Sequence, residues 1–171
     1  MKYLMVLLTF WVSSRAYSAE ALTTVVSKSN HVYFVGGDNQ REKIFNATLP
    51  GDISAYNQVA LHFKLSCPSG RCDPWDRVGS FGIKSQDEKA SYIELLRFMT
   101  PFGIGGEWNL DVTDYWPLLQ GEQTFKIFID TWVGPGSPYG DGWLVDVSLS
   151  YVPGPRSETT VFIATVLSFS N

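Results

Sequence analysis

Short runs of β-branched and aromatic residues, separated by Gly, Pro, Asn and Asp, recur along the chain beyond residue 18. In the run 59–65 the odd-numbered residues are all apolar, whereas His62 and Lys64 take the opposite side of an extended chain. This period of two is typical of a half-buried β-strand, and helical periodicity is almost absent. The sequence therefore predicts an all-β protein, an antiparallel jelly-roll-like β-sandwich.

Nine runs are predicted to be strands, with one helical turn among them. The turn covers 113–119, where Thr113 or Asp114 can cap the first amides and Gly121 can end it. The predicted strands are 31–35, 42–47, 58–65, 77–84, 92–100, 107–112, 124–132, 143–152 and 160–169. The sandwich domain is expected to cover 19–152, and 153–171 is expected to hold a proline-rich linker and one further strand.

The first part of the chain predicts a signal peptide over 1–18. Lys2 precedes an apolar run at 3–12, and Ala16 and Ser18 offer the small residues that a signal peptidase reads. The protein is thus expected to be exported, to a bacterial periplasm or to the outside. Loss of Lys2 and Arg15 with this segment lowers the formal net charge from -4 to -6. Because no basic cluster is present and no run is long enough to span a bilayer, we expect neither nucleic acid nor membrane as a partner.

The two cysteines, Cys67 and Cys72, stand close together in CPSGRCDPWDR. In an exported protein such a pair is expected to form a disulfide. On chain-entropy grounds so short a loop gains only about 2 kcal/mol, so its main effect is to stiffen the residues that follow. The number and spacing of the cysteines exclude a four-cysteine zinc site and a redox CxxC pair.

Most familiar catalytic patterns are absent from the sequence. His31 and His62 lie in separate predicted strands without metal-binding spacing, and there is no nucleophile elbow or phosphate-binding loop. For both histidines the favoured interpretation is a non-catalytic side chain on a solvated strand face. We therefore expect neither a metal nor a cofactor.

Two aspartates that lie beside aromatic residues are the remaining candidates. Asp76, between Trp75 and Arg77, directly follows the expected disulfide loop and could act as a general base on a sugar-bearing substrate, with the indole against the sugar and the guanidinium on an oxygen. The alternative is a turn aspartate paired with Arg77. In 124–132, alternation puts the odd-numbered residues on one face, and Asp130 and Trp132 on the other, less apolar face. Here the alternative is a solvated pair of Asp130 with Lys126.

Four blocks of the sequence resemble the amino-terminal domain of peptide-N-glycosidase F in order and spacing. They read CPSGRCDPWDRVGSFGI, IELLRFMTPFGIGG, LDVTDYWPLLQGE and KIFIDTWVGPG. The resemblance implies an amidase that cleaves the bond between an asparagine side chain and the first N-acetylglucosamine of an N-glycoprotein. It implies that Asp76 activates the attacking water and that Arg77 adjoins it. It puts Asp130 where the family has a supporting glutamate, one methylene longer, and Trp132 near the sugar.

The resemblance also implies a second jelly-roll-like domain that contributes a further glutamate. On this interpretation the sequence holds the first domain and the first strand of the second, and three alternatives follow. The chain is half of an amidase completed by a separately encoded second domain, a glycan- or glycopeptide-binding module that uses Trp75, Trp132 and Arg77, or a non-functional fragment. The ascorbate-dependent copper monooxygenases have a similar double jelly roll, but two isolated histidines and Met99 cannot build their metal sites.

Overall fold

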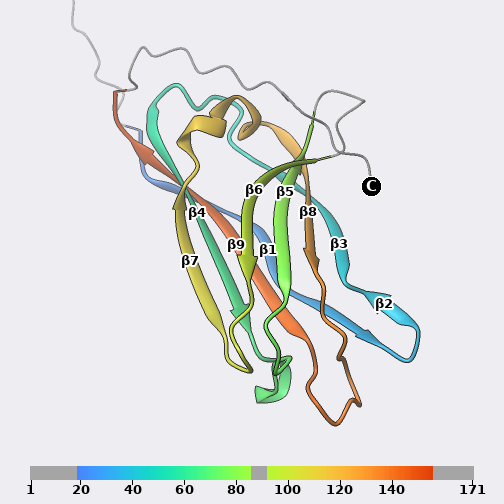
Figure 1. Cartoon of the computed structure of the whole chain (residues 1–171). Coiled ribbons are helices and arrows are strands. Elements are labelled where there is room, and N and C mark those ends of the chain that lie inside the picture. The colour runs from blue at the N-terminus through green and yellow to red at the C-terminus, as the bar shows by residue number, and fades with distance from the viewer. Residues whose placement is uncertain (1–18, 86–91, 156–171) are drawn as a thin grey trace, which may run out of the picture.

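Two antiparallel β-sheets face each other in the computed structural model, which describes residues 19–85 and 92–155 (Figure 1). The larger sheet has the strand order β2-β1-β9-β4-β7 and the smaller has the order β3-β8-β5-β6. The strands are β1 Leu22–Val35, β2 Asp38–Gln40, β3 Glu42–Thr48, β4 Tyr56–Ser66, β5 Val78–Lys84, β6 Tyr92–Met99, β7 Gly106–Asp111, β8 Glu122–Ile129 and β9 Trp143–Pro153. Two 3₁₀ turns, η1 (Pro68–Gly70) and η2 (Thr113–Leu118), complete the elements.

The strand pairing is that of a jelly roll. Apart from the short β2, the strands form nested antiparallel pairs, from the two ends of the chain toward its middle. These pairs are β1 with β9, β3 with β8, β4 with β7, and β5 with β6. The pairs β4–β9 and β5–β8 then join these units into the two sheets. This is one long hairpin wrapped into a sandwich, so the predicted jelly-roll-like architecture is confirmed.

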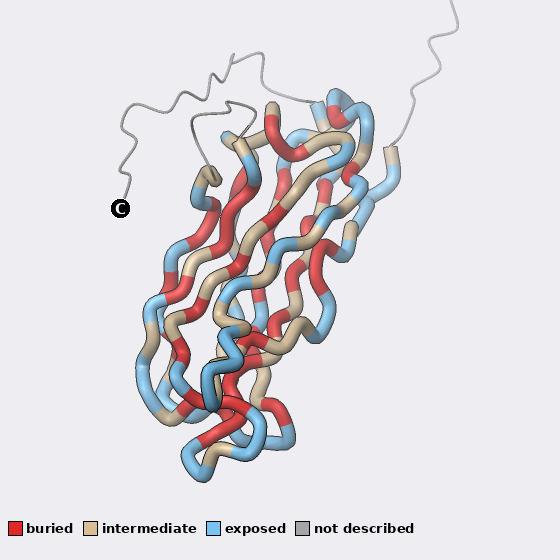
Figure 2. The backbone as a smooth tube through the Cα atoms, turned by 90° about the vertical axis from the view of Figure 1, so that its right-hand side faces the viewer, coloured by how far each residue is buried: buried red, intermediate tan, exposed pale blue. Residues whose placement is uncertain are grey.

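The core lies between the sheets and follows the period-two pattern. Buried and exposed residues alternate along the strands, as the red and pale segments of Figure 2 show. In β4 the apolar odd-numbered residues are buried, and His62 and Lys64 lie on the outer face as predicted. Phe63 is fully buried and contacts the rings of Phe81, Phe98 and Trp108. Aromatic packing of this kind contributes strongly to the stability of a small sandwich.

Several predicted boundaries differ from the structure. The first strand begins at Leu22 rather than at 31, with register shifts between Val25 and Asn30 where it pairs with β9. Such bulges break the alternation that reveals a strand in a sequence. The short polar β2 was not predicted, and β8 ends at Ile129 instead of 132. The helical turn is confirmed as η2. The expected signal peptide and the expected strand at 160–169 lie outside the described residues.

Three connections gather at one end of the sandwich, the lower end in Figure 1. They join β4 to β5, β6 to β7 and β8 to β9. The first carries Trp75, Asp76 and Arg77, and the last carries Asp130 and Trp132. The fold therefore brings all the predicted catalytic and substrate-binding residues to one end.

Candidate functional site

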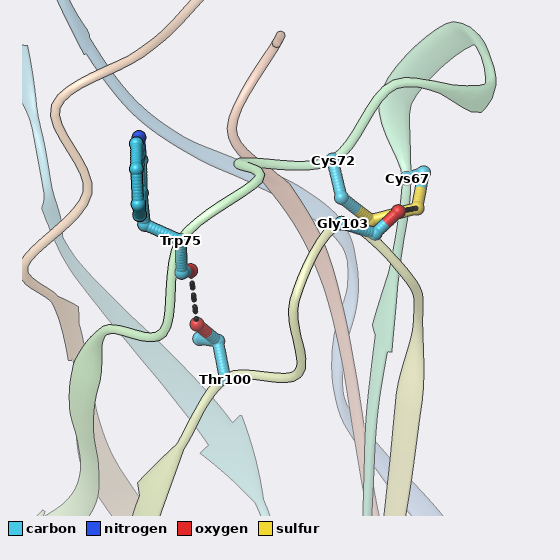
Figure 3. The surroundings of a disulfide bond; sticks show 5 residues. All are labelled: Cys67, Cys72, Trp75, Thr100 and Gly103. Carbon is cyan, nitrogen blue, oxygen red and sulfur yellow. Dashed lines mark hydrogen bonds between the residues drawn. A yellow bond between two sulfur atoms is a disulfide. The ribbon is translucent and has the colours of Figure 1, made fainter. Parts of the chain in front are cut away.

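The expected disulfide is present between Cys67 and Cys72, whose Cα atoms are 4.3 Å apart. It closes the turn η1, in which the Arg71 amide donates to the Pro68 carbonyl oxygen at 2.8 Å. The Cys67 sulfur also lies 3.9 Å from the carbonyl oxygen of Gly103 in the β6–β7 connection (Figure 3). The loop is thus fixed at its base before the chain reaches Trp75.

Trp75 and Asp76 both project into solvent. The Trp75 residue is 58% exposed, and its indole points away from the disulfide in Figure 3. Asp76 is exposed and makes no hydrogen bond or ion pair with any residue that the structure describes. Its carboxylate is therefore free to meet a ligand, whereas the main chain on either side of it is held.

Asp73 holds this segment from inside. It is 0% exposed, and its carboxylate accepts hydrogen bonds from the Trp75 amide at 3.0 Å, Arg77 Nε at 2.9 Å and Thr131 Oγ1 at 2.7 Å. Arg77 consequently pairs with Asp73, not with its neighbour Asp76 as the alternative interpretation supposed. Thr100 adds a second anchor, because its hydroxyl accepts from the Arg77 amide at 2.8 Å and donates to the Trp75 carbonyl at 3.2 Å.

Asp130 follows the last residue of β8 and lies beside β5. Its amide donates to the Val78 carbonyl at 3.0 Å, which continues the β5–β8 ladder beyond Gly79 and Ile129. Arg77 and Thr131 both bind Asp73, so the two connections share one buried carboxylate. The segment with Asp76 and the segment with Asp130 are thus fixed to each other.

The Asp130 carboxylate is bound by Arg41, which connects β2 and β3. Arg41 Nη1 lies 3.0 Å from Asp130 Oδ1, and the Asp130 side chain keeps 46% exposure. The predicted alternative partner, Lys126, instead lies 3.4 Å from Glu42 on the neighbouring strand. One oxygen of Asp130 is therefore engaged, and the side chain still reaches solvent.

Trp132 is 52% exposed and stands against two side chains. Its ring centroid lies 5.2 Å from that of Phe34, in an edge-to-face arrangement. The Arg41 guanidinium lies 4.5 Å from the Trp132 ring centroid and 4.9 Å from that of Phe34. These contacts fix the indole and leave half of its surface open to solvent.

The β8–β9 connection is held against the disulfide loop by a second ion pair. Arg71 forms two hydrogen bonds with the Asp141 carboxylate, at 2.7 and 3.2 Å. The Asp141 amide donates back to the Arg71 carbonyl at 2.9 Å. Gly140 packs so closely here that a Cβ would lie 2.3 Å from the Cys72 carbonyl oxygen. The two connections therefore behave as one packed unit.

Across residues 19–85 and 92–155, no three His, Cys, Asp or Glu side chains lie close enough to hold a metal ion. In the same ranges no helix is long and apolar enough to cross a membrane. A shallow groove of about 330 Å³ lies instead on the outer face of the larger sheet, lined by residues that include His62, Lys64 and Asp146.

Sequence reasoning did not identify Asp73 and Arg41. Asp73 carried a local signal, because an aspartate before proline favours a turn that its side chain closes two residues on, as the bond to the Trp75 amide does here. Arg41 carried no such signal. It is 89 positions away from Asp130 in the chain, and only the β3–β8 pairing brings the two together.

Comparison with known proteins relates the chain to one family. Residues 80–151 match the family described as peptide-N-glycosidase F, N terminal. A curated relative, peptide-N(4)-(N-acetyl-beta-D-glucosaminyl)asparagine amidase F of Elizabethkingia miricola, is 33% identical over 109 residues. Two solved structures are similar, a recombinant N-glycanase F (26% identity, TM-score 0.69) and PNGase F of Flavobacterium meningosepticum (25% identity, TM-score 0.70).

The coverage of these matches is uneven. The match to the curated relative includes 61% of this chain and 29% of the relative. The two structural matches include 80% and 81% of this chain and 43% of each solved chain. The chain thus spans less than half the length of these relatives. Within the shared part the chain is similar to these relatives in both sequence and fold. The chain therefore carries an N-terminal domain of the peptide-N-glycosidase F family.

Proposed function

We propose that this chain supplies the first-domain half of an exported amidase that releases N-glycans from glycoproteins. The observation that carries the proposal is the state of Asp76: an exposed carboxylate without a partner among the described residues, on a segment held by a disulfide and by buried Asp73. Such an acceptor is suited to take a proton from water. The relation to an asparagine amidase supplies the substrate class.

In the proposed reaction, water adds to the side-chain amide carbon of a glycosylated asparagine while Asp76 accepts its proton. The carbon–nitrogen bond then breaks while Asp76 returns the proton to the leaving nitrogen, which leaves an aspartic acid side chain on the peptide and a glycosylamine. Trp75 and Trp132 provide exposed indole surface for the sugar. Arg77 Nε and Nη2 face Asp73, and its Nη1 has no partner among the described residues, so it is available for a substrate oxygen. Asp130 supports the site through its exposed oxygen.

The proposal includes a second structural unit that completes the site. Support comes from the relatives, because this chain spans 43% of each of the two solved chains. It also comes from apolar side chains left exposed at the end that carries the site, among them Phe102 and Ile104. The unit could be a continuation of the chain or a separately encoded partner. Export is proposed on the signal-peptide pattern of 1–18, and the disulfide is consistent with an oxidising compartment.

Binding of glycopeptides without turnover is the second candidate. It is favoured by one observation, that Asp130 is already engaged by Arg41 while Trp75 and Trp132 remain open. The two candidate functions differ in the effect expected from a substitution of Asp76. Truncation of Trp132 should weaken binding in both, but Asp76→Asn should reduce turnover about 10²–10⁴-fold in the first and leave binding unchanged in the second.

The test is glycan release from a denatured N-glycoprotein, read as a mobility shift and by mass. It is run with the chain alone and with the added second domain of the Elizabethkingia relative. We expect release in the completed system and a loss of about 10²–10⁴-fold in Asp76→Asn, the usual contribution of a general base. Asp114→Asn is the matched control, because Asp114 is an exposed aspartate in η2, at the other end of the sandwich. Equal release by wild type and Asp76→Asn would overturn the proposal.

A further inference from the structure

We propose that Asp73 is the positioning residue of this site, the group that holds Trp75, Asp76 and Arg77 in place without touching the ligand. The inference uses the proposed function for the identity of the ligand only. The buried Asp73 carboxylate fixes the segment whatever ligand the segment binds.

Complete burial of Asp73 is the first support for this role. A carboxylate at 0% exposure is costly unless a cation and several donors satisfy it. Arg77 Nε at 2.9 Å supplies the cation, and the Trp75 amide at 3.0 Å and Thr131 Oγ1 at 2.7 Å supply neutral donors. Two of these partners, Trp75 and Arg77, flank the predicted base, and the third, Thr131, follows Asp130, whose amide binds the Val78 carbonyl. The hydrogen bonds that compensate for the burial of the Asp73 carboxylate are thus the same bonds that fix the segment.

The two oxygens of Asp73 divide this work. Oδ1 accepts from the Trp75 amide and, at 3.5 Å, from Arg77 Nη2. Oδ2 accepts from Arg77 Nε and from Thr131 Oγ1, which lies beside Asp130. Oδ1 therefore sets the main chain before Asp76, and Oδ2 ties the segment to the β8–β9 connection. The main chain of Asp73 adds a third link, because its carbonyl accepts from the Gly103 amide at 3.1 Å.

Asp76 benefits from this arrangement although it makes no bond itself. The residues on both sides of it are held, Trp75 by Asp73 and Thr100, and Arg77 by Asp73 and Thr100. A general base needs a fixed position, and a displacement of about 1 Å can reduce a rate about 10²-fold. Asp73 provides that position and leaves the Asp76 carboxylate free.

Two substitutions remove the interaction while preserving shape. Asp73→Asn replaces the charged acceptor of the Trp75 amide by a weaker, neutral one and places an NH₂ against Arg77 Nε, so the Trp75 amide should be held less firmly and Arg77 should be released. Thr131→Val removes one donor to Oδ2 and keeps the volume, and Thr131→Ser restores that donor. Asp141→Asn is the matched control, because Asp141 is also a buried aspartate paired with an arginine, Arg71, at the same end of the sandwich.

The first measurement is amide hydrogen exchange of the full chain by NMR, which needs no ligand. In Asp73→Asn we expect exchange at Trp75 and Arg77 to accelerate about tenfold or more, while the β5 amides of Phe81 and Ile83 keep their protection. Thr131→Val should give a smaller acceleration that Thr131→Ser reverses. Unchanged exchange at Trp75 and Arg77 in Asp73→Asn, or an equal acceleration in Asp141→Asn, would overturn the inference.

The second measurement is binding of a glycopeptide prepared from a denatured N-glycoprotein, followed by titration calorimetry. We expect Asp73→Asn to weaken binding about tenfold or more, with Asp141→Asn unchanged, since a released Arg77 and Trp75 no longer present a fixed surface. If wild type binds no glycopeptide, the exchange experiment alone decides the role of Asp73, and the release assay in the completed system decides the proposed function. If wild type and Asp73→Asn bind equally, the inference fails and the proposed function survives.

Discussion

Replacement of Arg41 by methionine tests how firmly Asp130 and Trp132 are held. The substitution keeps an unbranched apolar stem and removes the guanidinium, and with it the ion pair to Asp130 and the contacts with the Phe34 and Trp132 rings. A partly exposed ion pair contributes about 0.2–1 kcal/mol, and each cation–π contact about 0.5–1 kcal/mol. Arg41→Met should therefore lower the free energy of unfolding by about 1–3 kcal/mol.

The assay is urea unfolding of wild type, Arg41→Met, Asp130→Asn and the double variant. The cycle isolates the Arg41–Asp130 coupling, which we expect at about 0.5–1 kcal/mol at low salt. In 1 M NaCl the screening length is about 3 Å, so the Arg41–Asp130 coupling should shrink. Most of the stability loss in Arg41→Met should remain, because it comes from the lost contacts with the Phe34 and Trp132 rings. A coupling near zero at low salt, or one indifferent to salt, would refute the assignment of Arg41 as the partner of Asp130.

Three further predictions concern the sandwich itself. Phe63→Ala should cost about 3–5 kcal/mol in urea unfolding because its ring is fully buried among others, whereas Ile44→Ala at an exposed position should change stability by less than about 0.5 kcal/mol. Burial raises the pKa of Tyr151, so the folded state favours the neutral phenol, and stability should fall as pH rises above about 10, less steeply in Tyr151→Phe. Gly140→Ala would place a Cβ 2.3 Å from the Cys72 carbonyl oxygen, and it should therefore lower the melting temperature in calorimetry by forcing the two connections apart.

The sequence predicted the parts of the fold that depend on period-two alternation. In β8, Phe125, Ile127 and Ile129 were predicted to share one face, and all three are fully buried. The prediction held even for Thr131, which lies beyond the end of the strand and is also buried. Alternation works here because one face of each strand packs against the opposite sheet, whatever residues that sheet carries.

Features that depend on distant partners were not predicted. The first half of β1 was missed because its pairing with β9 shifts register twice, and Ser29 has a positive φ of 50°. The Arg41–Asp130 pair was missed for the same kind of reason, since the choice between Arg41 and Lys126 depends on strand register. Local chemistry did better, as the Cys67–Cys72 disulfide shows. At the candidate site the sequence therefore identified the exposed residues, and the structure was needed to find what holds them.

NMR titration of the ¹⁵N-labelled chain with an N-glycopeptide tests where the proposed glycan-binding site lies. The same peptide without its sugar is the control. We expect sugar-dependent shift changes at Trp75, Asp76 and Trp132, including the indole signals of both tryptophans. Changes confined to the groove around His62 and Lys64 on the outer face of the larger sheet, or no changes at all, would contradict it.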